Sequence, residues 1–138
     1  MKYYKGEYKY ITAAVEKYET GIETDRAHSF THGELLPGGA LTIKKSYAWD
    51  GPSGPTFDTR TLMRGSLVHD CLYQLLRETD FGAPETHDER RKRADQVLYQ
   101  ICIEDGMWKW RAKWILAAVR KAGGAAAVRR QRKIYEAP

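Results

Sequence analysis

The clearest pattern in the chain is a helical spacing of apolar residues in its second half. Between about Arg60 and Arg77, apolar side chains recur every three or four positions and predict a helix with one buried stripe, made of Leu62, Met63, Leu67, Val68, Leu72, Leu75 and Leu76. A second helix is predicted after Thr86, which with Glu89 has the form of a capping box, and it runs through Ala94, Val97, Leu98, Ile101 and Cys102 to Gly106. The short connection makes these two helices antiparallel neighbours. A third helix is predicted from about Trp108 to Ala122.

The first half of the chain lacks this spacing and favours extended structure. The segment from Tyr8 to Ile22 is rich in Tyr, Thr, Ile and Val and predicts one or two strands. A turn at Pro37–Gly39 precedes a further predicted strand, Leu41–Tyr47. Two glycines and two prolines between positions 51 and 55 indicate that residues 47–56 form an irregular loop. The expected fold class is therefore α+β, in one domain: 1–47 mainly β, 48–59 loop, 60–122 helical, and 123–138 a basic tail.

Composition narrows the class of protein. With 42% hydrophobic and 30% charged residues, the chain is typical of a globular domain. Its two cysteines, Cys71 and Cys102, are too few for a disulfide scaffold and are predicted to be reduced, packed thiols. The longest apolar runs fall far short of the roughly 20 residues that cross a bilayer, and the amino terminus has no apolar signal core. We therefore expect the protein to stay in the cytoplasm or to be packaged into a particle.

Candidate chemistry lies on the two antiparallel helices. His69 and Tyr73 are four residues apart and share a face, while Asp70 lies about 100° further round the helix. Asp95 lies on the side of the second helix that carries Leu98, so it is expected to point partly toward the first helix. A carboxylate that faces a histidine across a helix pair forms a base with its orienting group. The alternatives are a satisfied surface His-Asp pair, a packing role for Tyr73, and a salt bridge from Asp95 to a neighbouring arginine, either Arg91 or Arg93.

Several strings in the chain carry a family resemblance that begins at about Leu41: YAWDGPSGPT, RGSLVHDCLYQLLR, RADQVLYQIC and AVRKAGG. They resemble an uncharacterised domain family of phages and prophages. More distantly, a glycine-rich loop before an HDxxY helix, with an aspartate on a second helix, is similar to the catalytic core of the phospholipase A2 superfamily. The resemblance implies a host bacterial cytoplasmic or virion location, and calcium-dependent ester hydrolysis that serves host lysis or penetration.

The same resemblance implies a role for each matching residue. His69 is similar to the superfamily's general base, Asp95 to the aspartate that fixes the histidine ring, and Tyr73 to the tyrosine that hydrogen-bonds that aspartate. Asp70 resembles the calcium-binding carboxylate, with loop carbonyls supplying further oxygen ligands from Trp49, Gly51 and Gly54. The chain departs from the superfamily where a disulfide would join the two helices, because Leu72 and Ala94 take those positions. The loop departs too, since it contains Asp50, Pro52, Ser53 and Pro55.

The net charge of +5 and the third helix suggest an anionic partner. Trp108, Trp110 and Trp114 are interspersed with basic residues, a mixture found on helices that lie on anionic phospholipid membranes. The alternative is a core-facing stripe with a solvated basic face, the stripe being Trp114, Ala118, Ile115, Val119 and Ala122. The basic residues continue into the tail at Arg129, Arg130, Arg132 and Lys133. No recognised motif supports nucleic-acid binding through these basic side chains.

Two other functions stay open at the level of sequence. The main alternative is a non-catalytic virion or tail-associated protein, in which a buried network of His69, Tyr73 and Asp95 holds the helices together and the partners are other virion proteins. A metal phosphohydrolase built on the His-Asp pair would need further histidine ligands on other helices. The remaining histidines, His28, His32 and His87, are predicted to lie in loops, which argues against that function.

Overall fold

A computed structural model of the chain describes residues 1, 3–4, 10–49, 59–79 and 86–122. Within these residues the strands come first and the helices follow, which confirms the α+β class. The strands are β1 (Tyr3–Tyr4), β2 (Tyr10–Thr12), β3 (Glu16–Glu19), β4 (His28–Phe30), β5 (Gly33–Leu35), β6 (Ala40–Ile43) and β7 (Ala48–Trp49). The helices are α1 (Arg60–Glu78), α2 (His87–Glu104) and α3 (Lys109–Ala122).

The strands form two small antiparallel sheets. One has the order β1-β2-β7 and the other the order β3-β6-β5-β4. Gly33 in β5 lies opposite Ile43 and packs against the backbone of β6 so closely that an added Cβ would lie 2.0 Å from the Thr42 carbonyl oxygen. The pairing of β5 with β6 therefore depends on a glycine at this position.

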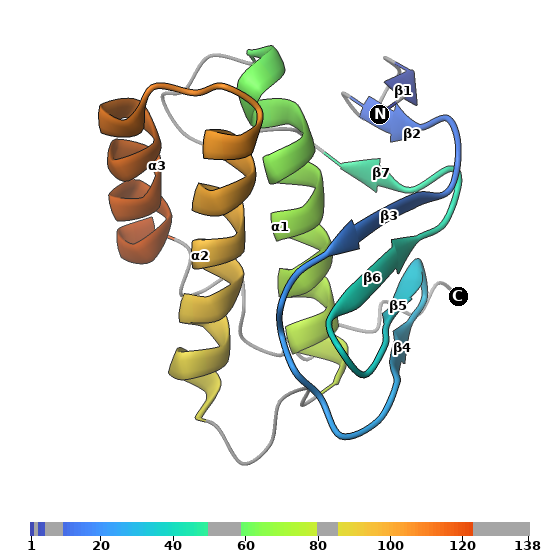
Figure 1. Cartoon of the computed structure of the whole chain (residues 1–138). Coiled ribbons are helices and arrows are strands. Elements are labelled where there is room, and N and C mark those ends of the chain that lie inside the picture. Colours follow the sequence, from blue (N-terminus) through green and yellow to red (C-terminus); the bar gives the residue numbers. More distant parts are fainter. Residues whose placement is uncertain (2, 5–9, 50–58, 80–85, 123–138) are drawn as a thin grey trace, which may run out of the picture.

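Helix α1 is the centre of the molecule. It lies between the strands and α2, and α3 packs on the far side of α2 (Figure 1). Every residue of its predicted apolar stripe is buried, as are side chains on its other faces such as Ser66 and Cys71. Because α1 is covered on both sides, two of its polar residues, Ser66 and His69, are buried as well.

The predicted helix boundaries and the predicted antiparallel pair are confirmed (Figure 1). The Thr86 hydroxyl accepts a hydrogen bond from the backbone N–H of Glu89 at 3.2 Å, and the Glu89 carboxylate accepts one from the Thr86 N–H at 3.1 Å. Gly106 follows the end of α2 with φ +91°, a left-handed conformation that glycine adopts without strain. Both cysteines are buried free thiols, as expected.

Three expectations are corrected in the first half of the chain. The pair β4 and β5 was not predicted, so His28 lies in a strand and not in a loop, whereas His32 does lie in the turn between them. Ala48 and Trp49 fall within the predicted irregular loop but form β7, because they pair with β2. The strand predicted at Leu41–Tyr47 ends at Ile43. The glycines and prolines of the loop itself lie outside the described residues.

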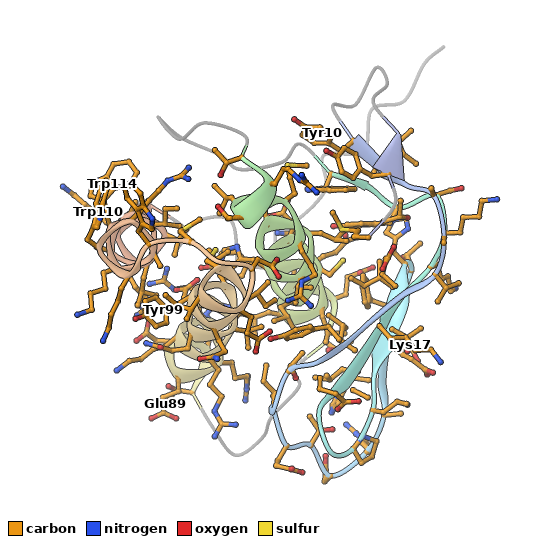
Figure 2. The ribbon with its side chains drawn as sticks, turned by 45° about the horizontal axis from the view of Figure 1, so that its top comes forward. Tyr10, Lys17, Glu89, Tyr99, Trp110 and Trp114 are labelled. Carbon is orange, nitrogen blue, oxygen red and sulfur yellow. The ribbon has the colours of Figure 1, made fainter. Side chains whose placement is uncertain are left out.

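Two further corrections concern the helices. His87 is the first residue of α2 and not part of a loop. Trp114 was weighed as part of a core-facing stripe, but its side chain lies on the outer side of α3 together with Trp110 (Figure 2). Ala112 and Ile115 form the buried side of α3 instead. None of the helices among the described residues is long and apolar enough to cross a membrane.

Candidate active site between α1 and α2

His69, Tyr73 and Asp95 meet between α1 and α2. The Nε2 atom of His69 lies 2.7 Å from Oδ1 of Asp95, and the Tyr73 hydroxyl donates a hydrogen bond to the same oxygen at 2.5 Å. Asp95 is completely buried, and the other two residues are buried as well. The predicted orientation of Asp95 toward the first helix is confirmed, although its catalytic role stays a prediction.

The two helices position these side chains by simple periodicity. His69 and Tyr73 are one helical turn apart on α1, so their rings stack with centroids 4.1 Å apart and an interplanar angle of 42°. On α2, Asp95 is flanked by Ala94 and is one turn away from Leu98, both of which pack in the core. Leu72 and Ala94, the positions of the absent disulfide, are both completely buried. Core packing therefore holds this helix pair together.

Arg120 belongs to the same network, and the sequence did not reveal it. Its guanidinium donates a hydrogen bond to Oδ2 of Asp95 at 2.9 Å and another to Asp88 at 3.3 Å. Arg91 in turn donates to the backbone carbonyls of Val119 and Arg120, at 3.5 and 3.2 Å. The last turns of α3 are thus joined to α2 at Asp95. No local sequence motif predicts this contact, because Arg120 is 25 residues from Asp95 in the chain.

These contacts determine the charge state of Asp95. Burial by itself raises the pKa of a carboxyl group, but the hydrogen bonds from His69, Tyr73 and Arg120 outweigh it, and the pKa of Asp95 is lowered from its ordinary value. Burial and the hydrogen bond to Asp95 both raise the pKa of the Tyr73 hydroxyl. Asp95 is therefore an ionised acceptor and Tyr73 a neutral donor at neutral pH.

The ionised Asp95 also determines which nitrogen of His69 is basic. Because an ionised carboxylate can only accept hydrogen bonds, Nε2 of His69 carries the proton in this bond. In the neutral ring the lone pair therefore lies on Nδ1. That nitrogen faces Asp70, whose Oδ1 is 4.0 Å away. The Asp70 side chain is 40% exposed, compared with 10% for that of His69. The basic nitrogen therefore lies on the side of His69 that carries the partly exposed Asp70.

Of the four residues implied to bind calcium, Asp70 and Trp49 lie among the described residues. Asp70 offers a partly exposed carboxylate beside the basic nitrogen, which fits the oxygen ligands that calcium prefers. The buried Trp49 ring donates from Nε1 to the hydroxyl of Ser66 at 3.2 Å, which ties β7 to the turn of α1 just before His69. The predicted ligands Gly51 and Gly54 lie outside the described residues.

The geometry gives no support to a histidine-rich metal centre. Among residues 1, 3–4, 10–49, 59–79 and 86–122, no group of three or more His, Cys, Asp and Glu side chains could hold a metal ion. His28 lies in β4, where burial lowers its pKa, and His87 lies at the start of α2. Neither residue is a partner of His69 in the hydrogen bonds and ion pairs described above.

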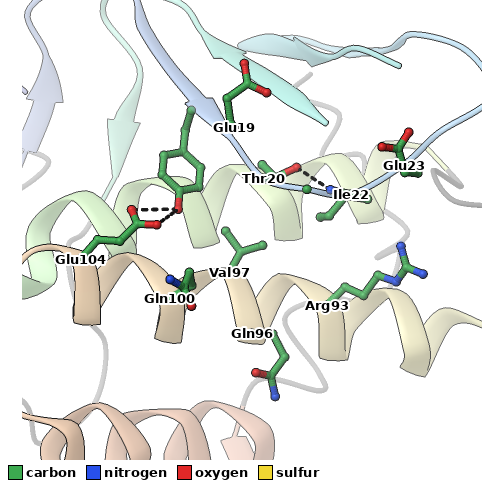
Figure 3. A pocket seen from close by; sticks show the side chains of 11 residues that line it. Glu19, Thr20, Ile22, Glu23, Arg93, Gln96, Val97, Gln100 and Glu104 are labelled. Carbon is green, nitrogen blue, oxygen red and sulfur yellow. Dashed lines mark hydrogen bonds between the residues drawn. The ribbon is translucent and has the colours of Figure 1, made fainter. Parts of the chain in front are cut away.

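A separate groove lies between α2 and the chain that follows β3 (Figure 3). It has a volume of about 620 Å³ and is lined by polar side chains that include Gln96, Gln100 and Arg93. The Tyr18 hydroxyl donates to the Glu104 carboxylate at its edge, at 3.2 and 3.4 Å. No histidine is present among its described lining residues, so this groove offers no base of the kind found between α1 and α2.

Comparisons with protein-family models, with curated proteins and with solved structures found no match to this chain. The assignment of a function therefore depends on the geometry of the site and on the resemblance noted in the sequence.

Proposed function

We propose that this protein is a calcium-dependent ester hydrolase of the phospholipase A2 type, with His69 as its general base. The observation that carries the proposal is the 2.7 Å contact of His69 Nε2 with the buried, ionised Asp95, which leaves Nδ1 as the basic nitrogen beside Asp70. A phage protein with this activity would damage the host membrane during lysis or penetration.

The chemistry follows from the roles of these groups. Nδ1 of His69 takes a proton from a water molecule while the water oxygen attacks the ester carbonyl carbon. Asp95 stabilises the imidazolium that forms, and Tyr73 and Arg120 hold Asp95 in place. His69 then returns the proton to the departing alkoxide, so the products are a carboxylic acid and an alcohol. Calcium bound at Asp70 would supply positive charge for the oxyanion.

The test is hydrolysis of phosphatidylglycerol in mixed micelles, with calcium or with a chelator. We expect chelator-sensitive release of fatty acid that falls about 100-fold or more in His69→Asn, the usual effect of losing a general base. Asp70→Asn should also lose activity, and because its side chain is partly exposed and the substitution keeps its shape, the variant should unfold within a few degrees of the wild type. His32→Asn is the matched control, since His32 lies in the β4–β5 turn.

One observation favours a second function, that of a non-catalytic virion or tail-associated protein. Arg120 gives Asp95 a permanent positive partner, so the network is satisfied without any transfer of a proton to His69. In that case the wild-type protein would be folded but would release no fatty acid with calcium present, and His69→Asn would change only its stability. This result would contradict the proposed hydrolase function.

A further inference from the structure

The outer face of α3 has an unusual composition for a helix at the edge of a protein. Trp110, Lys113, Trp114, Ala117 and Lys121 recur at three- and four-residue spacing, and all five are exposed. The buried side of the helix, at Ala112 and Ile115, points the opposite way. Figure 2 shows Trp110 and Trp114 directed away from α1 and α2. Large apolar rings thus lie on the face of α3 that has no neighbour among the described elements.

Three exposed tryptophans lie on α3 or directly before it: Trp108 precedes the helix, and Trp110 and Trp114 are one turn apart on its outer face. Trp108, Trp110 and Trp114 are 72%, 66% and 49% exposed, and the rings of Trp108 and Trp110 are 6.1 Å apart between centroids. The fourth tryptophan, Trp49, is buried in the core. Indole rings contribute a large apolar area and usually find a partner, so three in one exposed patch indicate a binding surface.

The charged side chains of helix α3 itself are all basic. Helix α3 has no acidic residue, whereas Lys109, Lys113 and Lys121 are all exposed on it. Arg120 is already bonded to Asp88 and Asp95, so it belongs to the fold and not to this surface. A lysine side chain can lay its methylene groups along an apolar surface while its ammonium group reaches an anion. The patch therefore complements a surface that is both apolar and anionic.

We propose that the outer face of α3, made of Trp108, Trp110, Trp114, Lys109, Lys113 and Lys121, docks on anionic phospholipid bilayers. The helix would lie flat, with its indoles at the level of the headgroups and its lysines bonded to lipid phosphates. Tryptophan is enriched in protein–protein interfaces but lysine is depleted there, so it is the mixture of indoles and lysines on one helix face that favours a phospholipid surface over a protein partner. Single-stranded nucleic acids are bound along basic grooves, whereas α3 is the outermost helix of the molecule (Figure 1).

This inference does not depend on His69 being a catalyst. The test therefore uses vesicles of ether lipids, which have no ester bond to hydrolyse, with ether analogues of phosphatidylglycerol and phosphatidylcholine in equal amounts. Cosedimentation and a blue shift of tryptophan fluorescence are the two measurements. We expect saturable binding to these vesicles and much weaker binding to phosphatidylcholine analogues alone, because the lysines have no anionic headgroups to meet.

Variants at the patch define the contribution of each kind of residue. The pair Trp110→Ala and Trp114→Ala should weaken vesicle binding about tenfold or more, because it removes apolar area from the contact. Lys113→Gln should weaken binding about fivefold, the usual effect of one charge near such a surface. The matched controls, Lys17→Gln on β3 and Val15→Ala, remove an exposed charge and an exposed apolar side chain elsewhere and should leave binding unchanged.

Two results would overturn the proposal. One is wild-type protein, folded by circular dichroism, that does not cosediment with the phosphatidylglycerol-analogue vesicles. The other is vesicle binding that is the same in the double tryptophan variant and in wild type. Binding of single-stranded DNA that depends on Trp110 and Trp114, without vesicle binding, would instead identify a nucleic-acid surface. The assay of ester-lipid hydrolysis by the wild type tests the proposed hydrolase function separately, so either proposal can fail while the other holds.

Discussion

At the scale of single residues, three elements of the molecule meet at one carboxylate. Asp95 accepts hydrogen bonds from His69 and Tyr73 on α1 and from Arg120 on α3. A buried carboxylate is stable only when such partners compensate for its lost hydration, and removal of one member of a buried charge network leaves the others unsatisfied. Asp95 is therefore expected to contribute to stability whether or not His69 is a catalyst.

The low pKa of Asp95 makes its contribution depend on pH. Its native pKa lies below the ordinary value of 3.8, so between these two values the unfolded chain binds more protons than the native one. The stability that Asp95 supplies is complete above about pH 4 and is lost as the pH falls through the native pKa. We expect Asp95→Asn to lower the free energy of unfolding by about 3 kcal/mol at pH 7, and by progressively less below pH 4.

Urea denaturation followed by circular dichroism between pH 7 and pH 2.5 measures this difference. Asp88→Asn is the matched control, because it removes another carboxylate bonded to Arg120, but one that is exposed to solvent. Its effect at pH 7 should be much smaller. A loss of stability in Asp95→Asn that stays constant over the whole pH range would show that the ionised carboxylate is not the source of the stability.

The sequence predicted part of this network for a clear physical reason. His69, Tyr73 and the inward side of α2 follow from helical spacing, which is a local property of the chain. Arg120 could not be predicted, because its contact depends on how α3 packs against α2. Trp114 was misjudged for a related reason: spacing defines faces of a helix, but burial depends on which face meets a neighbour. On α3 that face carries Ala112 and Ile115.

At the scale of elements, strong local signals decided what could be predicted. The helices have long apolar stripes and a capping box, so their bounds were close to those observed. Strands β4 and β5 contain only three residues each, and each has a single core apolar side chain, Phe30 in β4 and Leu35 in β5, which is too few to show a period in the sequence. They form because Gly33 allows close pairing with β6, which is a contact between distant parts of the chain. Such pairing leaves no periodicity to recognise.

The capping box of α2 gives a prediction for an element. Thr86→Ala removes the hydroxyl that accepts from the Glu89 N–H, so we expect the free energy of unfolding to fall by about 1 kcal/mol. Thr86→Ser keeps a hydroxyl at the same position and should retain most of that stability. Urea denaturation at pH 7 compares the three proteins. Equal stability of the Ala and Ser variants would mean that the cap does not stabilise the helix.

At the scale of the whole molecule, the core consists of two parts. The larger cluster joins both sheets to α1 and α2, and includes Leu41, Leu72 and Ile101. The smaller cluster lies under α3 and joins Ala112 and Ile115 to Leu62, Leu98 and Cys102. Since α3 packs mainly on α2, we expect it to separate while the larger cluster stays intact, at the cost of the smaller cluster and of the Arg120–Asp95 bond. The face that we propose to meet a membrane thus belongs to the least enclosed helix.

Native-state hydrogen exchange tests this division. We expect amides of α3 to exchange through a partial opening that costs less free energy than the global unfolding needed to expose α1. Leu41→Ala weakens only the larger cluster, so it should speed exchange in α1 by about 100-fold and leave α3 unchanged, provided that the partial opening remains the easier one. Ile115→Ala should speed amide exchange in both α1 and α3, because Ile115 becomes exposed in the partial opening and in global unfolding alike. Equal acceleration of α1 and α3 by Leu41→Ala would instead make the two clusters one cooperative unit, and α3 would then be as firmly held as the helices that carry His69 and Asp95.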